Sequence, residues 1–71
     1  MPNEWYEVES SNIKAITYKQ EKQELYVKFK NDQVYVYHDV SENMFQDFLN
    51  ADSKGKFFAS NIKHDYSWRK V

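Results

Sequence analysis

The sequence predicts an α+β domain in which a three-stranded antiparallel β-meander is followed by two short helices packed on one face. Three observations indicate this fold. Three short runs rich in β-branched and aromatic residues come first, apolar residues at helical spacing follow, and only short polar segments separate them. The chain has 71 residues, which is enough for one such domain and leaves no room for a second.

Three strands are expected, over residues 13–18, 24–30 and 33–38. The second alternates cleanly, with Leu25, Val27 and Phe29 on one face. The third reads Gln-Val-Tyr-Val-Tyr-His and consists mostly of residue types that favour strands. The polar segments between these runs predict short turns, so neighbouring strands should pair in antiparallel order.

Two serine residues, Ser41 and Ser53, are expected to cap the two helices, because a serine hydroxyl accepts a hydrogen bond from the first helical turn. After Ser41, one apolar stripe is formed by Met44, Phe45, Phe48 and Leu49. Gly55 lies in the first turn of the second helix, where the missing side chain permits close packing. The tail over 66–71 suits either a short edge strand or an extended arm.

Two parts of the chain are distinguished, an irregular lead over 1–9 and a single domain over 10–71. The start has neither the basic region nor the apolar region of a signal peptide, and no run of about 18 apolar residues occurs. We therefore expect a cytoplasmic protein without membrane contact.

Aromatic residues make up 18% of the chain, and cysteine is absent. The absence of cysteine excludes a disulfide framework and any thiolate zinc site. Aromatic rings are expected to supply the core instead, since each buries roughly 150–250 Å². A domain of this size buries only about 60% of its unfolded surface, so some rings are also expected outside.

The turn at residues 31–32 leaves two strand registers open. A two-residue turn points Tyr35 and Tyr37 outward, where they would form a base-stacking platform with neighbouring lysines. A three-residue loop with a bulge pairs Phe29 with Gln33 and turns both tyrosines inward under the helices. Val34 and Val36, which alternate with the tyrosines, favour the first register, because valine is buried at lower cost than tyrosine.

Three motifs together resemble the KTSC domain family over roughly residues 10–71. They are Ser11-Asn12-Ile13, Tyr35-Val36-Tyr37 and a C-terminal run that contains Ser53, Gly55, Phe57, Phe58, Asn61, Ile62, Lys63 and Tyr66. The family is named after the C-terminal region of some lysyl-tRNA synthetases and includes small free-standing bacterial and phage-type proteins. Its Tyr-x-Tyr signature favours the inward register. Asp32 and Ser41 depart from the glycine and proline that the family often has there.

The basic C-terminal segment is the main candidate for function. Residues 53–71 carry five cations and one carboxylate, a net charge of +4, whereas residues 1–9 carry −3. Cations bind phosphates and aromatic rings stack on bases. We therefore expect nucleic-acid contacts from Lys54, Lys56, Lys63, Tyr66, Trp68, Arg69 and Lys70. The alternative is a solvated face whose lysines serve solubility.

Other candidate sites are weaker. The dipeptides His38-Asp39 and His64-Asp65 offer metal ligands, but surface histidines are far more common, so no metal is expected. Asn61 is expected to bond the backbone near 11–12. The sequence has neither a nucleophile elbow nor a glycine-rich loop, and no enzyme, cofactor or small-molecule substrate is indicated.

The resemblance implies RNA binding through the synthetase connection and supplies no catalytic residues. We therefore predict a non-catalytic module that binds RNA, tRNA in particular. The alternative is a protein-interaction or homo-oligomer module that uses an exposed strand edge or the rings of Trp5 and Trp68. Trp5 and Tyr6 would otherwise fasten the lead to the domain.

Overall fold

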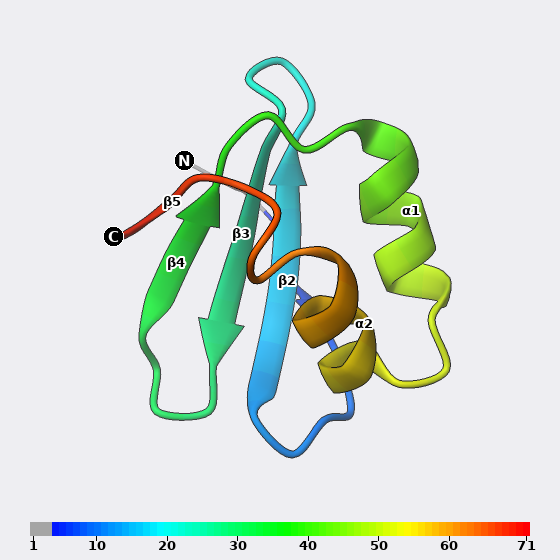
Figure 1. The fold of residues 1–71 in the computed structure, drawn as a ribbon. Coiled ribbons are helices and arrows are strands. Elements are labelled where there is room, and N and C mark those ends of the chain that lie inside the picture. Colours follow the sequence, from blue (N-terminus) through cyan, green and yellow to red (C-terminus); the bar gives the residue numbers. More distant parts are fainter. Residues whose placement is uncertain (1–3) are drawn as a thin grey trace.

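The computed structural model describes residues 4–71 and shows one antiparallel sheet with both helices on the same face (Figure 1). The strands are β1 (Tyr6–Glu7), β2 (Ile13–Lys19), β3 (Glu24–Phe29), β4 (Val34–Tyr37) and β5 (Trp68–Lys70). The helices are α1 (Glu42–Asn50) and α2 (Lys54–Asn61). The sheet order is β1-β2-β3-β4-β5. The α+β fold, its meander and its short C-terminal strand are therefore confirmed.

Strand β1 lies within the lead that the sequence predicted as irregular. Tyr6 pairs with Ile16 of β2, and its ring centroid lies 6.0 Å from that of Phe45 in α1. The Lys28 ammonium lies 4.7 Å from the centre of the Trp5 ring. A strand of two residues is too short to show alternation, so the sequence gives no signal for it. Residues 1–3 of the predicted lead lie outside the described residues.

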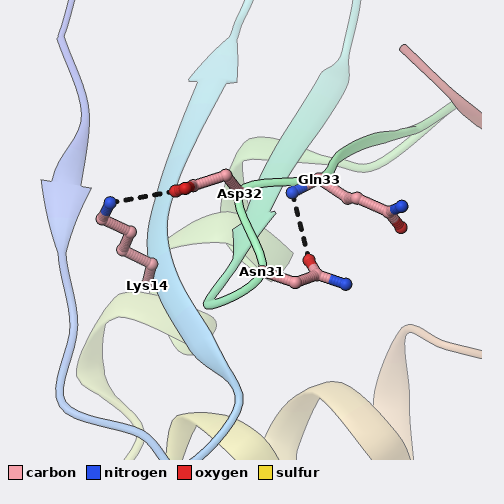
Figure 2. A network of polar contacts seen from close by, with 4 residues as sticks. All are labelled: Lys14, Asn31, Asp32 and Gln33. Carbon is pink, nitrogen blue, oxygen red and sulfur yellow. Dashed lines mark hydrogen bonds and ion pairs between the residues drawn. The ribbon is translucent and has the colours of Figure 1, made fainter.

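A three-residue bulged loop joins β3 to β4. The Asp32 amide donates to the Phe29 carbonyl oxygen at 2.8 Å, and the Phe29 amide donates to the Gln33 carbonyl oxygen at 2.9 Å. Asp32 has a φ of 70° in the left-handed region, as this loop requires. The Asp32 carboxylate pairs with Lys14, while the side chains of Asn31 and Gln33 extend to the opposite side of the turn (Figure 2).

The bulged loop decides which way the two tyrosines of β4 point. Tyr37 pairs with Leu25 and Tyr35 with Val27, and both partners are fully buried on the helix-covered face. The inward register is therefore confirmed, and the outward register favoured by the valines is wrong. The bulge adds one residue to the loop, which exchanges the two faces of the following strand.

Both predicted serine caps are confirmed. The Ser41 hydroxyl accepts from the Met44 amide at 3.1 Å, and the Ser53 hydroxyl accepts from the Lys56 amide at 3.3 Å. The caps satisfy amide groups that have no partner inside the helix. They fix where each short helix begins, and the two helices then lie on the inner face of the sheet.

The core fills the space between the inner sheet face and the two helices. Its fully buried members are Ile13, Ile16, Leu25, Val27, Val40, Phe48 and Ile62. Aromatic rings extend the core, because Phe45 and Phe58 are buried and the hydroxyl of Tyr18 donates to the Val40 carbonyl oxygen. Within residues 4–71, no helix has the length and apolar character needed to cross a membrane.

Candidate functional site

A cleft of about 750 Å³ opens on the helix-covered face, between the β3–β4 hairpin and the chain that follows α2. Its lining residues are Ser11, Asn12, Phe29, Lys30, Asn31, Gln33, Tyr35, Tyr37, Phe58, Lys63, His64 and Trp68. Segments far apart in sequence meet here because α2 packs over β3 and β4. Ring contacts of Phe58 with Phe29 and Tyr37, at 5.6 and 5.5 Å between centroids, fix that packing.

Aromatic rings form the inner wall of the cleft. Phe29 meets Tyr35 edge-on at 5.5 Å between centroids, and Tyr35 meets Trp68 at 5.2 Å with a 54° tilt. Trp68 pairs with Tyr37 across β5 and β4, which places its ring on the same face as the tyrosines. Its side chain is 53% exposed. The wall therefore runs from buried Tyr37 and partly buried Phe29 outward to the half-exposed indole of Trp68.

Tyr37 lies at the bottom of the cleft and is only 4% exposed. Burial raises its pKa to about 12, with a smaller contribution from the neighbouring Tyr35 phenol. At neutral pH the phenol is protonated, as tyrosines ordinarily are, and it can donate a hydrogen bond.

The rim of the cleft carries side-chain amides that are held by neighbouring groups. The Ser10 hydroxyl donates to Asn12 Oδ1 at 2.9 Å, and its oxygen accepts the amides of Asn12 and Ile13. The Asn12 carbonyl oxygen in turn accepts the Lys30 amide at 2.9 Å. Asn31 Oδ1 accepts the Gln33 amide at 3.1 Å. Asn12 and Asn31 thus use their side-chain oxygens within the fold, and their side-chain NH₂ groups remain available for other partners.

The charge of the cleft is positive. Among the described residues that line it, Lys30 and Lys63 are cationic, His64 adds an imidazole, and carboxylates are absent. A second groove of about 420 Å³ differs, since its lining includes Glu4, Glu21 and Glu42 and one lysine. The two hollows therefore favour ligands of opposite charge, and the cleft favours an anion.

Three of the residues predicted to contact nucleic acid lie at or beside the cleft. Lys63 and Trp68 line it. Lys70 pairs with Tyr35 and so lies on the same face of β5 as Trp68, where it is exposed.

The other predicted contacts lie elsewhere. Arg69 pairs with Val36, and alternation along β5 places it on the opposite face from Trp68. Lys54 donates to the Ala51 carbonyl oxygen at 2.7 Å, which holds it at the start of α2. Lys56 is exposed on α2, and Tyr66 is half-buried against the core. The predicted nucleic-acid contacts are thus near one another in the sequence but lie on different surfaces of the structure.

Lys30, Asn31 and Gln33 were not predicted as site residues, although all three line the cleft. The bulged loop carries them, and its register was the point that the sequence left open. Once Tyr35 and Tyr37 face inward, the loop residues beside them become neighbours of the same hollow. The sequence feature that could have indicated these residues is the turn at residues 31–32, because the length of its loop decides which face of β4 is turned toward the cleft.

A model of the KTSC domain family matches residues 9–66. This chain belongs to the KTSC domain family. The crystal structure of a KTSC domain protein from Yersinia pestis superposes with a TM-score of 0.92 and 35% identity, over 96% of each chain. The family assignment and the fold therefore agree.

Two sequence relatives differ in length. A lysine–tRNA ligase of Nostoc punctiforme is 35% identical over 63 residues, which are 89% of this chain and 11% of the ligase. A protein of Tsukamurella paurometabola is 38% identical over 56 residues, 79% of this chain and 84% of that protein. This KTSC domain thus spans a small part of the ligase and most of the second relative.

The family motif residues of this KTSC domain divide between the cleft and its support. Asn12, Tyr35 and Tyr37 line the cleft. Supporting roles fall to buried Ile13 and Ile62, to Ser53 at the helix cap, to Gly55, and to Phe57, whose ring stacks on Phe48 at 5.4 Å. A Cβ on Gly55 would lie 3.3 Å from Ser10 Oγ and 3.4 Å from Asn12 Oδ1. The expected close packing at Gly55 is confirmed.

The prediction for Asn61 is wrong. Its amide donates to the Phe57 carbonyl oxygen at 3.3 Å within α2, and it does not reach the backbone near residues 11–12. A side chain four residues after a carbonyl lies directly above it on a helix, so the local bond is the nearer one. Gly55, nearly two turns earlier in α2, makes the approach to Ser10 and Asn12 instead.

The two histidines have separate surroundings. His38 Nδ1 lies 3.6 Å from Glu24 Oε2 on β3, whereas His64 lines the cleft. Across residues 4–71, no group of three or more histidine or carboxylate side chains is placed to hold a metal ion.

Proposed function

We propose that this KTSC domain is a non-catalytic RNA-binding module and that the cleft is its contact surface. One observation carries the proposal. The cleft combines the half-exposed Trp68 ring with Lys30 and Lys63 and has no carboxylate among its described lining residues. Cations that bind phosphates beside rings that stack on bases are the usual means of holding single-stranded RNA.

One relative supports RNA as the partner. A lysine–tRNA ligase contains a segment 35% identical to this chain. We propose tRNA as the first RNA to test, in the cytoplasm of a bacterial or phage-infected cell. The proposed contacts are Trp68, Lys30 and Lys63, with Lys70 on the same face of β5.

The test is tRNA binding measured by fluorescence anisotropy at increasing salt. We expect affinity at low salt that falls as salt rises, because bound cations displace counterions from phosphates. Lys63→Gln should flatten the salt dependence by about one phosphate contact, whereas Arg69→Gln should leave it unchanged. The absence of binding at low salt, or equal effects of the two variants, would contradict the proposal.

A second candidate function is self-association or protein binding through β5. This strand lies at the edge of the sheet, and both Trp68 and Val71 are exposed, at 53% and 71%. An exposed edge can pair with a strand of another chain. Sedimentation velocity distinguishes the two functions, since pairing through β5 predicts a dimer that Trp68→Pro disrupts, whereas RNA binding alone predicts a monomer.

A further inference from the structure

Hydrogen-bond donors dominate the lining of the cleft. Asn12 and Asn31 use their oxygens within the fold, so each offers its NH₂ group. Lys30 and Lys63 add ammonium groups, and the buried Tyr37 phenol remains protonated. Without a carboxylate in this lining, a ligand rich in acceptors is favoured, such as a phosphate together with a base edge.

The indole of Trp68 offers a surface for one flat group. It is tilted by 54° to Tyr35 at 5.2 Å, so the two rings form a corner and not a parallel pair. The Trp68 side chain is 53% exposed, so part of the indole remains open to a ligand. A flat ligand that stacks on this open part would share the cleft with the amides of Asn12 and Asn31, which belong to the same lining.

Stacking of this kind requires an unpaired base. Within a double helix the faces of the bases are covered by their neighbours, and proteins reach only the groove edges and the backbone. A cleft of about 750 Å³ is within the range of about 300–1,000 Å³ that suits a ligand the size of one nucleotide. The geometry therefore favours a single nucleotide that leaves its strand.

We propose that the cleft holds one unpaired purine nucleotide of an RNA strand, with its base on Trp68 and its phosphate held by Lys30 and Lys63. This inference rests on the proposed RNA-binding function. A purine is favoured over a pyrimidine because it has the larger area for stacking on Trp68.

The experiment uses the full chain with Trp5→Phe, which leaves Trp68 as the single tryptophan. Trp5 lies against Lys28 and away from the cleft lining, so its replacement leaves the cleft intact. Three RNA probes are titrated: a short uridine oligonucleotide with one central guanosine, the all-uridine oligonucleotide, and a blunt duplex that contains the guanosine. The fluorescence of Trp68 reports stacking directly.

The guanosine probe is expected to quench Trp68 and to bind about tenfold more tightly than the duplex, whose bases are not free to stack. It is also expected to bind several-fold more tightly than the all-uridine probe, because a purine has the larger stacking area. Anisotropy of the labelled probe then tests Trp68→Ala and Trp68→Phe. The alanine variant should lose about tenfold in affinity and the phenylalanine variant should recover most of it. Arg69→Gln, on the other face of β5, is the matched control and should bind as the parent does.

The outcomes separate this inference from the function on which it rests. If tRNA binds in a manner that depends on Lys63 but all three probes bind equally, RNA binding stands and the unpaired purine is refuted. Tighter binding of the duplex, or quenching that is equal for guanosine and uridine, refutes it in the same way. If neither tRNA nor any probe binds at low salt, the proposed function itself is refuted.

Discussion

The Phe29 amide donates to the Gln33 carbonyl oxygen at 2.9 Å, and this bond closes the loop that sets the register of β4. Through it, Tyr35 and Tyr37 face the helices and become the inner wall of the cleft. The length of that loop, three residues and not two, therefore decides whether these tyrosines line the cleft.

Replacement of Asp32 tests the loop. Asp32→Ala should lower the free energy of unfolding by about 1 kcal/mol, because alanine tolerates a positive φ less well than aspartate. Asp32→Gly should remain within about 0.5 kcal/mol of the parent, because glycine adopts this conformation without strain. Urea denaturation followed by circular dichroism measures both changes.

Lys14→Ala is the control for that comparison, because the ion pair between Lys14 and Asp32 is exposed on both sides. Exposed pairs contribute about 0–1 kcal/mol, so a loss below about 0.5 kcal/mol is expected. Equal losses in Lys14→Ala, Asp32→Ala and Asp32→Gly would assign the effect to the ion pair and contradict the backbone explanation.

A substitution at Gly55 tests the contact between α2 and the cleft rim. Gly55→Val should cost about 2 kcal/mol or more, since the added atoms press on Ser10 and Asn12. Ala59→Val is the matched control on an exposed position of the same helix and should cost about 0.5 kcal/mol. A loss in Gly55→Val no larger than that in Ala59→Val would contradict the close contact of Gly55 with Ser10 and Asn12.

Deprotonation of the Tyr37 phenol should lower the free energy of unfolding in strong base. Its pKa is raised from 10.0 to about 12, so the folded state holds the phenol proton more tightly than the unfolded state. This contribution is complete below pH 10 and is lost as the pH rises to about 12, by roughly 2–3 kcal/mol at most. Denaturation at several pH values should show this fall in the parent protein and in Tyr6→Phe.

Tyr37→Phe should lack that part of the pH dependence, because phenylalanine has no proton to lose. The absorbance of phenolate gives an independent measurement. Near pH 12, one tyrosine fewer should titrate in Tyr37→Phe than in the parent protein. An unchanged slope in Tyr37→Phe would contradict burial of the phenol at the bottom of the cleft.

The cap of α1 gives a prediction outside the cleft. Ser41→Ala removes the bond to the Met44 amide and should cost about 1 kcal/mol. Ser60→Ala, on an exposed position within α2, should change stability by less than about 0.5 kcal/mol. A smaller loss at Ser41 than at Ser60 would mean that water satisfies the freed amide equally well.

The fold was largely predictable because its signals are local. Alternation at Leu25, Val27 and Phe29 and the serines at Ser41 and Ser53 depend on near neighbours in the chain. Strand β1 at Tyr6 was missed because a strand of two residues is too short to show an alternating pattern of apolar and polar residues. The direction of Tyr35 depended on one bulged residue, and the family resemblance indicated it where the hydrophobic pattern did not.

The cleft was only partly predictable because its walls come from distant segments. Lys63 and Trp68 were expected from charge and aromatic content, and both line it. Arg69 belongs to the same run of sequence but lies on the other face, because side chains alternate along β5. The net charge of a segment does not show which face of the sheet each side chain occupies. The pairing of β5 with β4 is needed to assign Trp68 and Arg69 to their faces.

Strand β5 is joined to β4 by the chain over 38–67, which contains both helices. Every other neighbouring pair in the sheet is joined by a short turn or loop, so β5 requires the longest closure and is expected to dock last during folding. It is paired on one side and exposed along its length, so it is expected to open at a low free energy. A nascent or shortened chain that ends before Trp68 would therefore keep its core and both tyrosines but lack the outer wall, which makes the completed cleft a feature of the fully synthesised domain.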